Sequence, residues 1–282
     1  MRIFLTGNRG QLGRALETRL AEHVLGSGDL PEWDMTDPDA AIGAICDFRP
    51  DIVVHAAALT HVDYCAEHPE EAVRANGVGT YHVALACREI GAMCVAVSTN
   101  EVFDGRADRP YQEYDPRSPI NPYGYSKLVG EQVVERYAPA YMIVRTSWLY
   151  AAGGTNFIHK IIARAETGGP LRVVTDEVGS PTYVNDLADG IARLISVGRP
   201  GVFHLTNEGY CSRYEFAQEI LRLSGHDVPI EPITSDVFQR ASTPPPFAPL
   251  ANVFAAAQGV RLRSWRQALA EYIRDHASGG SV

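Results

Sequence analysis

The chain has 282 residues, of which 45% are hydrophobic and 21% charged, and its formal net charge is −9. These values are typical of a globular protein with one large domain or two interlocked domains. They exclude the basic stripe of a nucleic-acid binder, and no apolar run is long enough for a signal peptide or a membrane span.

Two further expectations follow from composition. The five cysteines are scattered without a Cys-x-x-Cys pair, so we expect reduced thiols in a cytoplasmic protein and neither a disulfide frame nor a zinc site. Because the chain is acidic overall, an anionic substrate would need a local cluster of donors.

A glycine-rich turn follows the first predicted strand, residues 2–6. Its three glycines are each separated by two residues, and leucines then recur at helical spacing. A strand, a glycine turn and a helix are the context in which a backbone approaches a dinucleotide pyrophosphate. We therefore predict a nicotinamide-dinucleotide site that contains Gly7, Asn8, Arg9, Gly10, Gln11, Leu12 and Gly13.

The second strand, predicted over residues 23–25, bears on the choice of cofactor. An NAD site usually places an acidic residue at the end of this strand, but here Asp29 comes late. Arg9 lies within the glycine turn and could meet a 2′-phosphate, so the sequence favours NADPH over NADH. Asp34 and Met35 could flank the adenine ring.

Three more strands are predicted over residues 52–58, 93–98 and 141–146, alternating with helical segments. This alternation predicts an α/β fold with a Rossmann-type, doubly wound parallel sheet. Ligands bind such sheets at the carboxyl ends of the strands. Small and hydroxyl-bearing residues at these ends complete the predicted cofactor site: Ala56, Ala57, Ala58, Thr60 and Ser98.

A candidate catalytic group lies between residues 98 and 127. Asn121 is a suitable helix cap, and the next residues predict a helix on which Tyr123 and Lys127 are neighbours four positions apart. A cation beside a phenol favours the phenolate and lowers its pKa, so Tyr123 could act as a proton donor. Thr99, at the end of a strand, could hold a carbonyl oxygen against it. Many helices carry Tyr-x-x-x-Lys by chance, so this interpretation depends on the glycine turn that accompanies it.

The second half is less regular. We expect helices over residues 157–166, 184–195, 212–223 and 265–273, strands over 171–174 and 202–205, a proline-rich loop over 239–251 and a frayed tail over 277–282. Residues 1–150 and 181–206 are assigned to the dinucleotide-binding domain. Residues 151–180 and 207–282 are assigned to a smaller α/β substrate domain.

Several stretches together resemble the dTDP-4-dehydrorhamnose reductase family of extended short-chain dehydrogenase/reductases. They are Thr6-Gly7-Asn8-Arg9-Gly10-Gln11-Leu12-Gly13, Ala56-Ala57-Ala58-Leu59-Thr60-His61-Val62-Asp63, Ser98-Thr99-Asn100-Glu101-Val102-Phe103-Asp104-Gly105, Arg145-Thr146-Ser147-Trp148-Leu149-Tyr150, Gly179-Ser180-Pro181-Thr182 and Ser242-Thr243-Pro244.

The resemblance implies reduction of the C4 carbonyl of a dTDP-4-keto-6-deoxy sugar by a reduced nicotinamide. Tyr123 would donate the proton, Lys127 would lower its pKa and bind the nicotinamide ribose, and Thr99 would bind the carbonyl oxygen. Trp148 would pack on the sugar ring. The expected substrate-binding residues are Thr99, Asn100, Glu101, Trp148, Asn156, Thr182 and Arg240. For Asn156 and Arg240 a purely structural role is an equally good interpretation.

Departures from the family pattern leave alternatives open. The family often has Asp-Tyr where this chain has Asn100-Glu101, and Glu101 is a trait of sugar-nucleotide dehydratases. A glutamate that binds magnesium at the dimer interface of some members corresponds to Ala15, so we expect no metal, while a homodimer stays possible. The alternatives are a non-catalytic nucleotide-binding regulatory subunit and an epimerase or dehydratase that retains its NAD.

Overall fold

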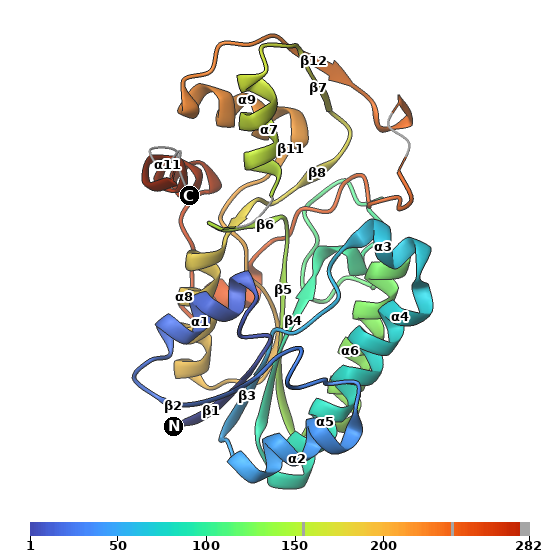
Figure 1. Ribbon diagram of the computed structural model, residues 1–282, viewed down its shortest axis with the longest axis vertical. Helices are drawn as coiled ribbons and strands as arrows, with labels where there is room; N and C mark the ends of the chain where they lie inside the picture. The colour runs from blue at the N-terminus through green and yellow to red at the C-terminus, as the bar shows by residue number, and fades with distance from the viewer. Residues whose placement is uncertain (154–155, 238–239, 277–282) are drawn as a thin grey trace.

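A computed structural model describes residues 1–153, 156–237 and 240–276. Its centre is a six-stranded parallel sheet in the order β10-β5-β4-β3-β1-β2 (Figure 1). The strand order reverses between β1 and β3, which is where such sheets bind ligands. The strands are β1 Arg2–Thr6, β2 Val24–Gly28, β3 Ile52–His55, β4 Met93–Thr99, β5 Ala140–Thr146 and β10 Gly201–His204.

Helices cover both faces of the sheet because the strands bury alternate residues on either side. In β1, Ile3 and Leu5 belong to one core cluster and Phe4 to the other. Helices α1 (Gln11–Arg19) and α8 (Val184–Val197) cover the first face. The opposite face carries α2 (Pro38–Phe48), α5 (Thr80–Ile90) and α6 (Pro122–Tyr137). The predicted α/β doubly wound fold is confirmed.

Short elements complete this half and build the rest of the molecule. The short helical segments are α3 (Val62–Glu67), α4 (Pro69–Val73), η1 (Arg74–Gly79) and η2 (Asn100–Val102). The later helices are α7 (Phe157–Glu166), α9 (Arg213–Ser224), η3 (Ser235–Val237), α10 (Val253–Ala257) and α11 (Trp265–His276). Three two-stranded sheets pair β6 (Leu149–Tyr150) with β9 (Thr182–Tyr183), β7 (Leu171–Val174) with β12 (Ile230–Ile233), and β8 (Val178–Gly179) with β11 (Cys211–Ser212).

The prediction for the second strand was too short. Gly26 and Gly28, which follow the predicted strand, continue β2 and pair with β1. A Cβ on Gly26 would come within 2.8 Å of the Phe48 ring, and one on Gly28 within 2.6 Å of the Trp33 ring. These glycines therefore make room for aromatic side chains that pack on the strand.

The third strand was predicted too long. It ends at His55, and residues 56–60 leave the sheet. His55 is 2% exposed, and its ring bridges the hydroxyls of Thr6 and Thr80 at 2.8 and 2.9 Å. The chain then turns away beside the glycine loop, where a ligand can approach.

Most predicted elements of the second half are present. The helix over 157–166 and the strand over 171–174 match, while the last helix runs on to His276. The predicted tail and residue 239 of the proline-rich loop lie outside the described residues. In the described part of the chain, no helix has the length and apolar character needed to cross a membrane. Within residues 181–206, α8 covers the main sheet and β10 joins its edge, while the two-domain division stays a prediction.

Candidate active site

The glycine turn forms a close-packed cradle between β1 and α1. Gly7 has a φ of 72°, a left-handed conformation that favours glycine. A Cβ on Gly7 would lie 2.6 Å from the Ala57 nitrogen, and one on Gly13 would lie 2.1 Å from the Gly7 oxygen. Helix α1 starts after Gly10 without a side-chain cap or an acidic residue in its first turn. Its N-terminal N–H groups suit a pyrophosphate, so the cradle fits a dinucleotide.

Arg9 lies at the rim of this cradle, 53% exposed. Its guanidinium contacts Glu32 at 2.7 Å and the Leu30 carbonyl at 2.8 Å. The Asp29 carboxylate accepts the Arg9 backbone N–H at 2.8 Å. Asp29, the acidic residue that comes late after the second strand, thus fixes the glycine turn. To bind a 2′-phosphate, Arg9 would have to give up its exposed ion pair with Glu32. Recognition of a 2′-phosphate by Arg9 therefore stays a prediction.

The remaining predicted cofactor residues line the loops beside the cradle. The Ala57 N–H donates to the Thr6 hydroxyl at 3.2 Å. Met35 packs against Gly79, and the Asp34 carboxylate accepts the Thr36 N–H at 2.8 Å. Ser98 differs, because its hydroxyl donates to Glu131 at 2.6 Å and is only 5% exposed as a residue. A cofactor contact by the Ser98 side chain is therefore disfavoured.

Helix α6 positions the catalytic candidates. The Asn121 side chain accepts the Gly124 N–H at 2.8 Å, which confirms the predicted cap. A Cβ on Gly124 would lie 2.0 Å from the Glu101 carbonyl oxygen, so this glycine lets α6 rest on the backbone that follows β4. Tyr123 is thereby brought near Thr99, whose hydroxyl acts on the pKa of the phenol. The sequence analysis did not identify this role of Gly124.

The electrostatics of Tyr123 correct one expectation. Its pKa was expected to be lowered by Lys127, but burial raises it, and the nearby Glu101 charge adds to the effect. The Thr99 hydroxyl offsets this in part. Burial also lowers the pKa of Lys127 to about 8, against the opposing effect of Glu131. The phenol thus stays protonated at neutral pH, as a proton donor must.

A buried ionic network stands behind this catalytic wall, by which we mean Thr99, Tyr123 and Lys127. Glu131, one turn after Lys127, is 2% exposed and accepts two bonds of 2.8 Å from Arg145 and one of 2.9 Å from Arg117. These cations hold the pKa of Glu131 below its usual range despite its burial. Separately, the Asn76 side chain bonds the Leu59 backbone, in the loop after β3, and donates to the Ser126 hydroxyl of α6. The helix is therefore fixed from two sides.

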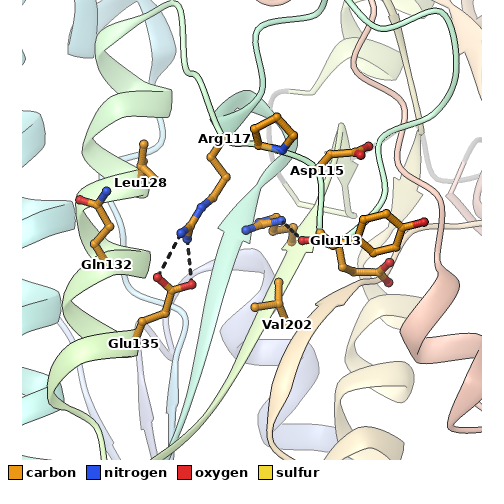
Figure 2. A pocket seen from close by; sticks show the side chains of 10 residues that line it. Glu113, Asp115, Arg117, Leu128, Gln132, Glu135 and Val202 are labelled. Atoms are coloured by element: carbon orange, nitrogen blue, oxygen red, sulfur yellow. Dashed lines mark hydrogen bonds and ion pairs between the residues drawn. The ribbon is translucent and has the colours of Figure 1, made fainter.

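A polar cavity of about 410 Å³ lies beyond this network (Figure 2). In it Arg117 reaches across to Glu135, and Arg145 donates to the Glu113 carbonyl at 3.2 Å. Its lining contains no residue of the catalytic wall. We assign the cavity to the framework behind the site.

A second wall comes from the irregular half of the chain, and we call Trp148, Glu177, Arg213 and Arg240 the charged wall. Trp148 has a φ of 45°, a conformation that costs a non-glycine residue about 1–2 kcal/mol. The Arg213 guanidinium carbon lies 3.5 Å from the centroid of its ring. Glu177 lies 3.6 Å from Arg213 and 3.7 Å from Arg240. One ring face of Trp148 is thus covered by Arg213, which leaves less of the indole for a sugar.

The proline-rich loop connects the two walls. The Thr243 carbonyl accepts the Asn121 amide at 3.1 Å, and the same amide donates to Glu101 at 2.6 Å. Arg240 pairs with Asp63 at 3.2 Å. Burial raises the pKa of Glu101, while Asn121 and the charged wall's arginines oppose that shift. Glu101 and Arg240 therefore lie where the two halves meet.

Three predicted substrate residues have structural partners instead. Thr182 is 0% exposed and its hydroxyl donates to the Ser180 carbonyl, so burial speaks against a substrate contact. The Asn156 side chain caps α7 and donates to the Ala151 carbonyl, which accounts for its polar groups. Asn100 is 5% exposed and holds the proline-rich loop through the Ala248 carbonyl at 3.1 Å.

The fold, the cradle and the catalytic wall define an extended short-chain dehydrogenase/reductase. The family model described as "RmlD substrate binding domain" matches residues 1–278. The chain belongs to this family of dTDP-4-dehydrorhamnose reductases.

Relatives match nearly end to end. The spore coat polysaccharide biosynthesis protein SpsK of Bacillus subtilis is 37% identical over 98% of both chains. The dTDP-4-dehydrorhamnose reductase of Streptomyces griseus is 39% identical over 96% of this chain and 92% of its own. The Bacillus anthracis dTDP-4-dehydrorhamnose reductase, solved in complex with NADP, has a TM-score of 0.93 and 34% identity over 97% of this chain and 99% of its own.

Proposed function

We propose that this protein reduces the C4 keto group of a dTDP-4-dehydro-6-deoxy sugar, with dTDP-4-dehydrorhamnose as substrate and dTDP-L-rhamnose as product. NADPH or NADH is the cofactor. The observation that carries the proposal is the placement of Thr99 near Tyr123, one helical turn from a buried Lys127, at the sheet edge that also holds the glycine cradle. Reductase relatives and the NADP complex of the Bacillus anthracis protein support the same assignment.

The catalytic wall would act on the carbonyl oxygen. The bound nicotinamide supplies the hydride. Thr99 and Tyr123 present two hydroxyls to the oxygen on which negative charge develops, and preorganised donors of this kind stabilise a transition state. Tyr123 transfers its proton to that oxygen because burial keeps the phenol protonated. Lys127 contributes a cation beside the cofactor ribose as long as it keeps its proton.

The cradle would hold the cofactor. Gly7, Gly10 and Gly13 let the backbone approach the pyrophosphate, and the start of α1 offers free N–H groups. Ala56 to Ala58 leave space for the cofactor beside β3. These residues would hold the cofactor at the sheet edge that also carries Tyr123.

A substrate screen tests the proposal. Purified protein is mixed with dTDP-4-dehydrorhamnose, or another dTDP-4-keto-6-deoxy sugar, and with NADPH or NADH, and the loss of reduced-cofactor absorbance is followed. We expect turnover with at least one cofactor and a product reduced at C4. No turnover with any keto sugar, together with tight binding to a partner enzyme, would instead support a regulatory subunit.

The geometry of Glu101 keeps a second candidate, an epimerase or dehydratase, open to test. Its carboxylate is buried near Tyr123. The adjacent Asn100 is an amide committed to the Ala248 carbonyl, so no second carboxylate stands there. Protein that purifies with NAD and turns over without added cofactor would favour this candidate over the reductase.

A further inference from the structure

Arg213 occupies an unfavourable place for a cation. It is the first residue of α9, where a positive side chain opposes the helix dipole. A capping box between Ser212 and Glu215 already binds free N–H groups at the start of this helix, so the Arg213 side chain is not needed to cap it. Locally unfavourable residues that a fold retains are typical of functional positions.

The Arg213 guanidinium is held mainly by stacking. Its carbon lies 3.5 Å from the centroid of the Trp148 ring and 5.0 Å from that of Phe157, and the side chain is 22% exposed. In the described ranges 1–153, 156–237 and 240–276, Glu177 is its one ion-pair partner, at 3.6 Å. That distance exceeds the about 2.7–2.9 Å of a charge-assisted hydrogen bond. The N–H donors of the Arg213 guanidinium, which is charged and held in place, thus remain available to another partner.

A second arginine stands beside it. Arg240, from the proline-rich loop, lies 3.7 Å from the same Glu177 carboxylate, and its charge lowers the pKa of Arg213. Burial contributes most to that lowering, to about 10, so Arg213 is still charged at neutral pH. The Asn121 amide, two residues before Tyr123, donates to the carbonyl of Thr243, three residues after Arg240, which places the arginines towards the catalytic wall. Two guanidinium groups therefore share one carboxylate next to the candidate active site.

We propose that Arg213 and Arg240 bind the diphosphate of the nucleotide sugar, with Trp148 as the plate that holds Arg213 in position. The inference rests on the proposed function, because a nucleotide sugar brings the diphosphate. The chain has a net charge of −9, so an anionic ligand needs a local cluster of cations such as this one. The planar fork of arginine matches two phosphate oxygens. Glu177 is the counter-ion that the diphosphate replaces.

The test measures binding by calorimetry, with dTDP and thymidine as probes. In Arg213→Gln the affinity for dTDP should fall about 10- to 100-fold, as expected for the loss of one charge-assisted bidentate contact. The affinities for thymidine, which lacks the diphosphate, and for NADPH should not change. Arg213→Lys keeps the charge but not the fork, so it should lose less. Arg266→Gln is the matched control, because Arg266 also lies over an indole, that of Trp265 at 4.3 Å, but on α11.

The sign of a second variant separates a binding site from a structural ion pair. Glu177→Gln should bind dTDP at least as tightly as the wild type, because it removes the competing carboxylate. If Glu177→Gln weakens dTDP binding as much as Arg213→Gln, or if Arg213→Gln binds dTDP normally, the inference is overturned. Should Arg213→Gln not fold, Arg213→Lys and Glu177→Gln carry the test.

Failure of this inference and failure of the proposed function give different results. A wild-type protein that reduces no keto sugar, but loses dTDP binding selectively in Arg213→Gln, contradicts the function and supports the site. An active reductase in which Arg213→Gln leaves the dTDP affinity unchanged supports the function and contradicts the site.

Discussion

The catalytic wall and the charged wall are built differently. Tyr123 and Lys127 stand on one helix, fixed by the Asn121 cap, by Gly124 and by the buried Glu131 network. The charged wall draws its residues from four segments of the irregular half, joined by ion pairs of 3.2 to 3.7 Å that include Asp63. The catalytic residues thus depend on the packing of one helix, while the charged wall depends on contacts between separate segments.

The largest expected effect is on the catalytic wall. Tyr123→Phe removes the proton donor and should lower turnover by ~10²–10⁴-fold, the usual contribution of a general acid, while NADPH affinity is nearly unchanged. Tyr125→Phe is the control, because Tyr125 lies on the same helix and is 55% exposed. Steady-state kinetics of both variants measure the effect. Unchanged turnover in Tyr123→Phe would contradict the assignment.

The cradle gives the next largest effect. In Gly13→Ala the new Cβ would lie 2.1 Å from the Gly7 oxygen, so the turn must shift. Overpacking of this kind costs about 1–3 kcal/mol, which corresponds to roughly a 10- to 100-fold loss of NADPH affinity if the displaced turn pays the whole cost. Gly43→Ala, on α2, has no heavy atom within 4 Å of its Cβ and serves as control. Equal NADPH titrations of the two variants would refute the cradle.

The pH dependence of turnover tests Lys127. Its pKa is lowered to about 8 by burial, so the cation is lost as pH rises through that value. Turnover should therefore fall by up to tenfold per pH unit above about 8, while the phenol is still protonated. Lys127→Arg stays charged at these pH values and should lose this alkaline limb, although its absolute rate is lower. If the turnover of Lys127→Arg falls over the same pH range as that of the wild type, the alkaline limb belongs to another group.

The smallest effect concerns Asn121, which connects the start of α6 with Glu101 and the proline-rich loop. Asn121→Ala removes the helix cap and the contacts with Glu101 and Thr243, and should lower the free energy of unfolding by about 1–2 kcal/mol. Asn121→Ser can keep a capping hydroxyl and should recover part of this loss. Urea unfolding measures both variants. If Asn121→Ser were no more stable than Asn121→Ala, the cap would not be the main contribution.

The sequence predicts most of what depends on local pattern. The sheet strands follow from apolar runs, and the start of α6 from Asn121 and Pro122, because caps and periodicity are local. Gly26 and Gly28 were not predicted as strand residues because the reason for a glycine there lies outside the strand. It is the space that the rings of Phe48 and Trp33 occupy.

The candidate site divides in the same way. Tyr123 and Lys127 share one motif, whereas Arg213 came from no motif and is recognised only by its position over Trp148. Thr182 lies in a motif of the family resemblance, yet it is fully buried. The pKa of Tyr123 could not be predicted either, because it depends on burial and on Glu101 more than on its helical neighbour.

Transfer of deuterium tests the central claim most directly. The wild-type protein is incubated with NADPH deuterated at the transferable position of the nicotinamide and with dTDP-4-dehydrorhamnose, and the product is analysed by NMR. We expect one deuterium, bound to C4 of the sugar. A product without deuterium at C4, or turnover without any added cofactor, would contradict it.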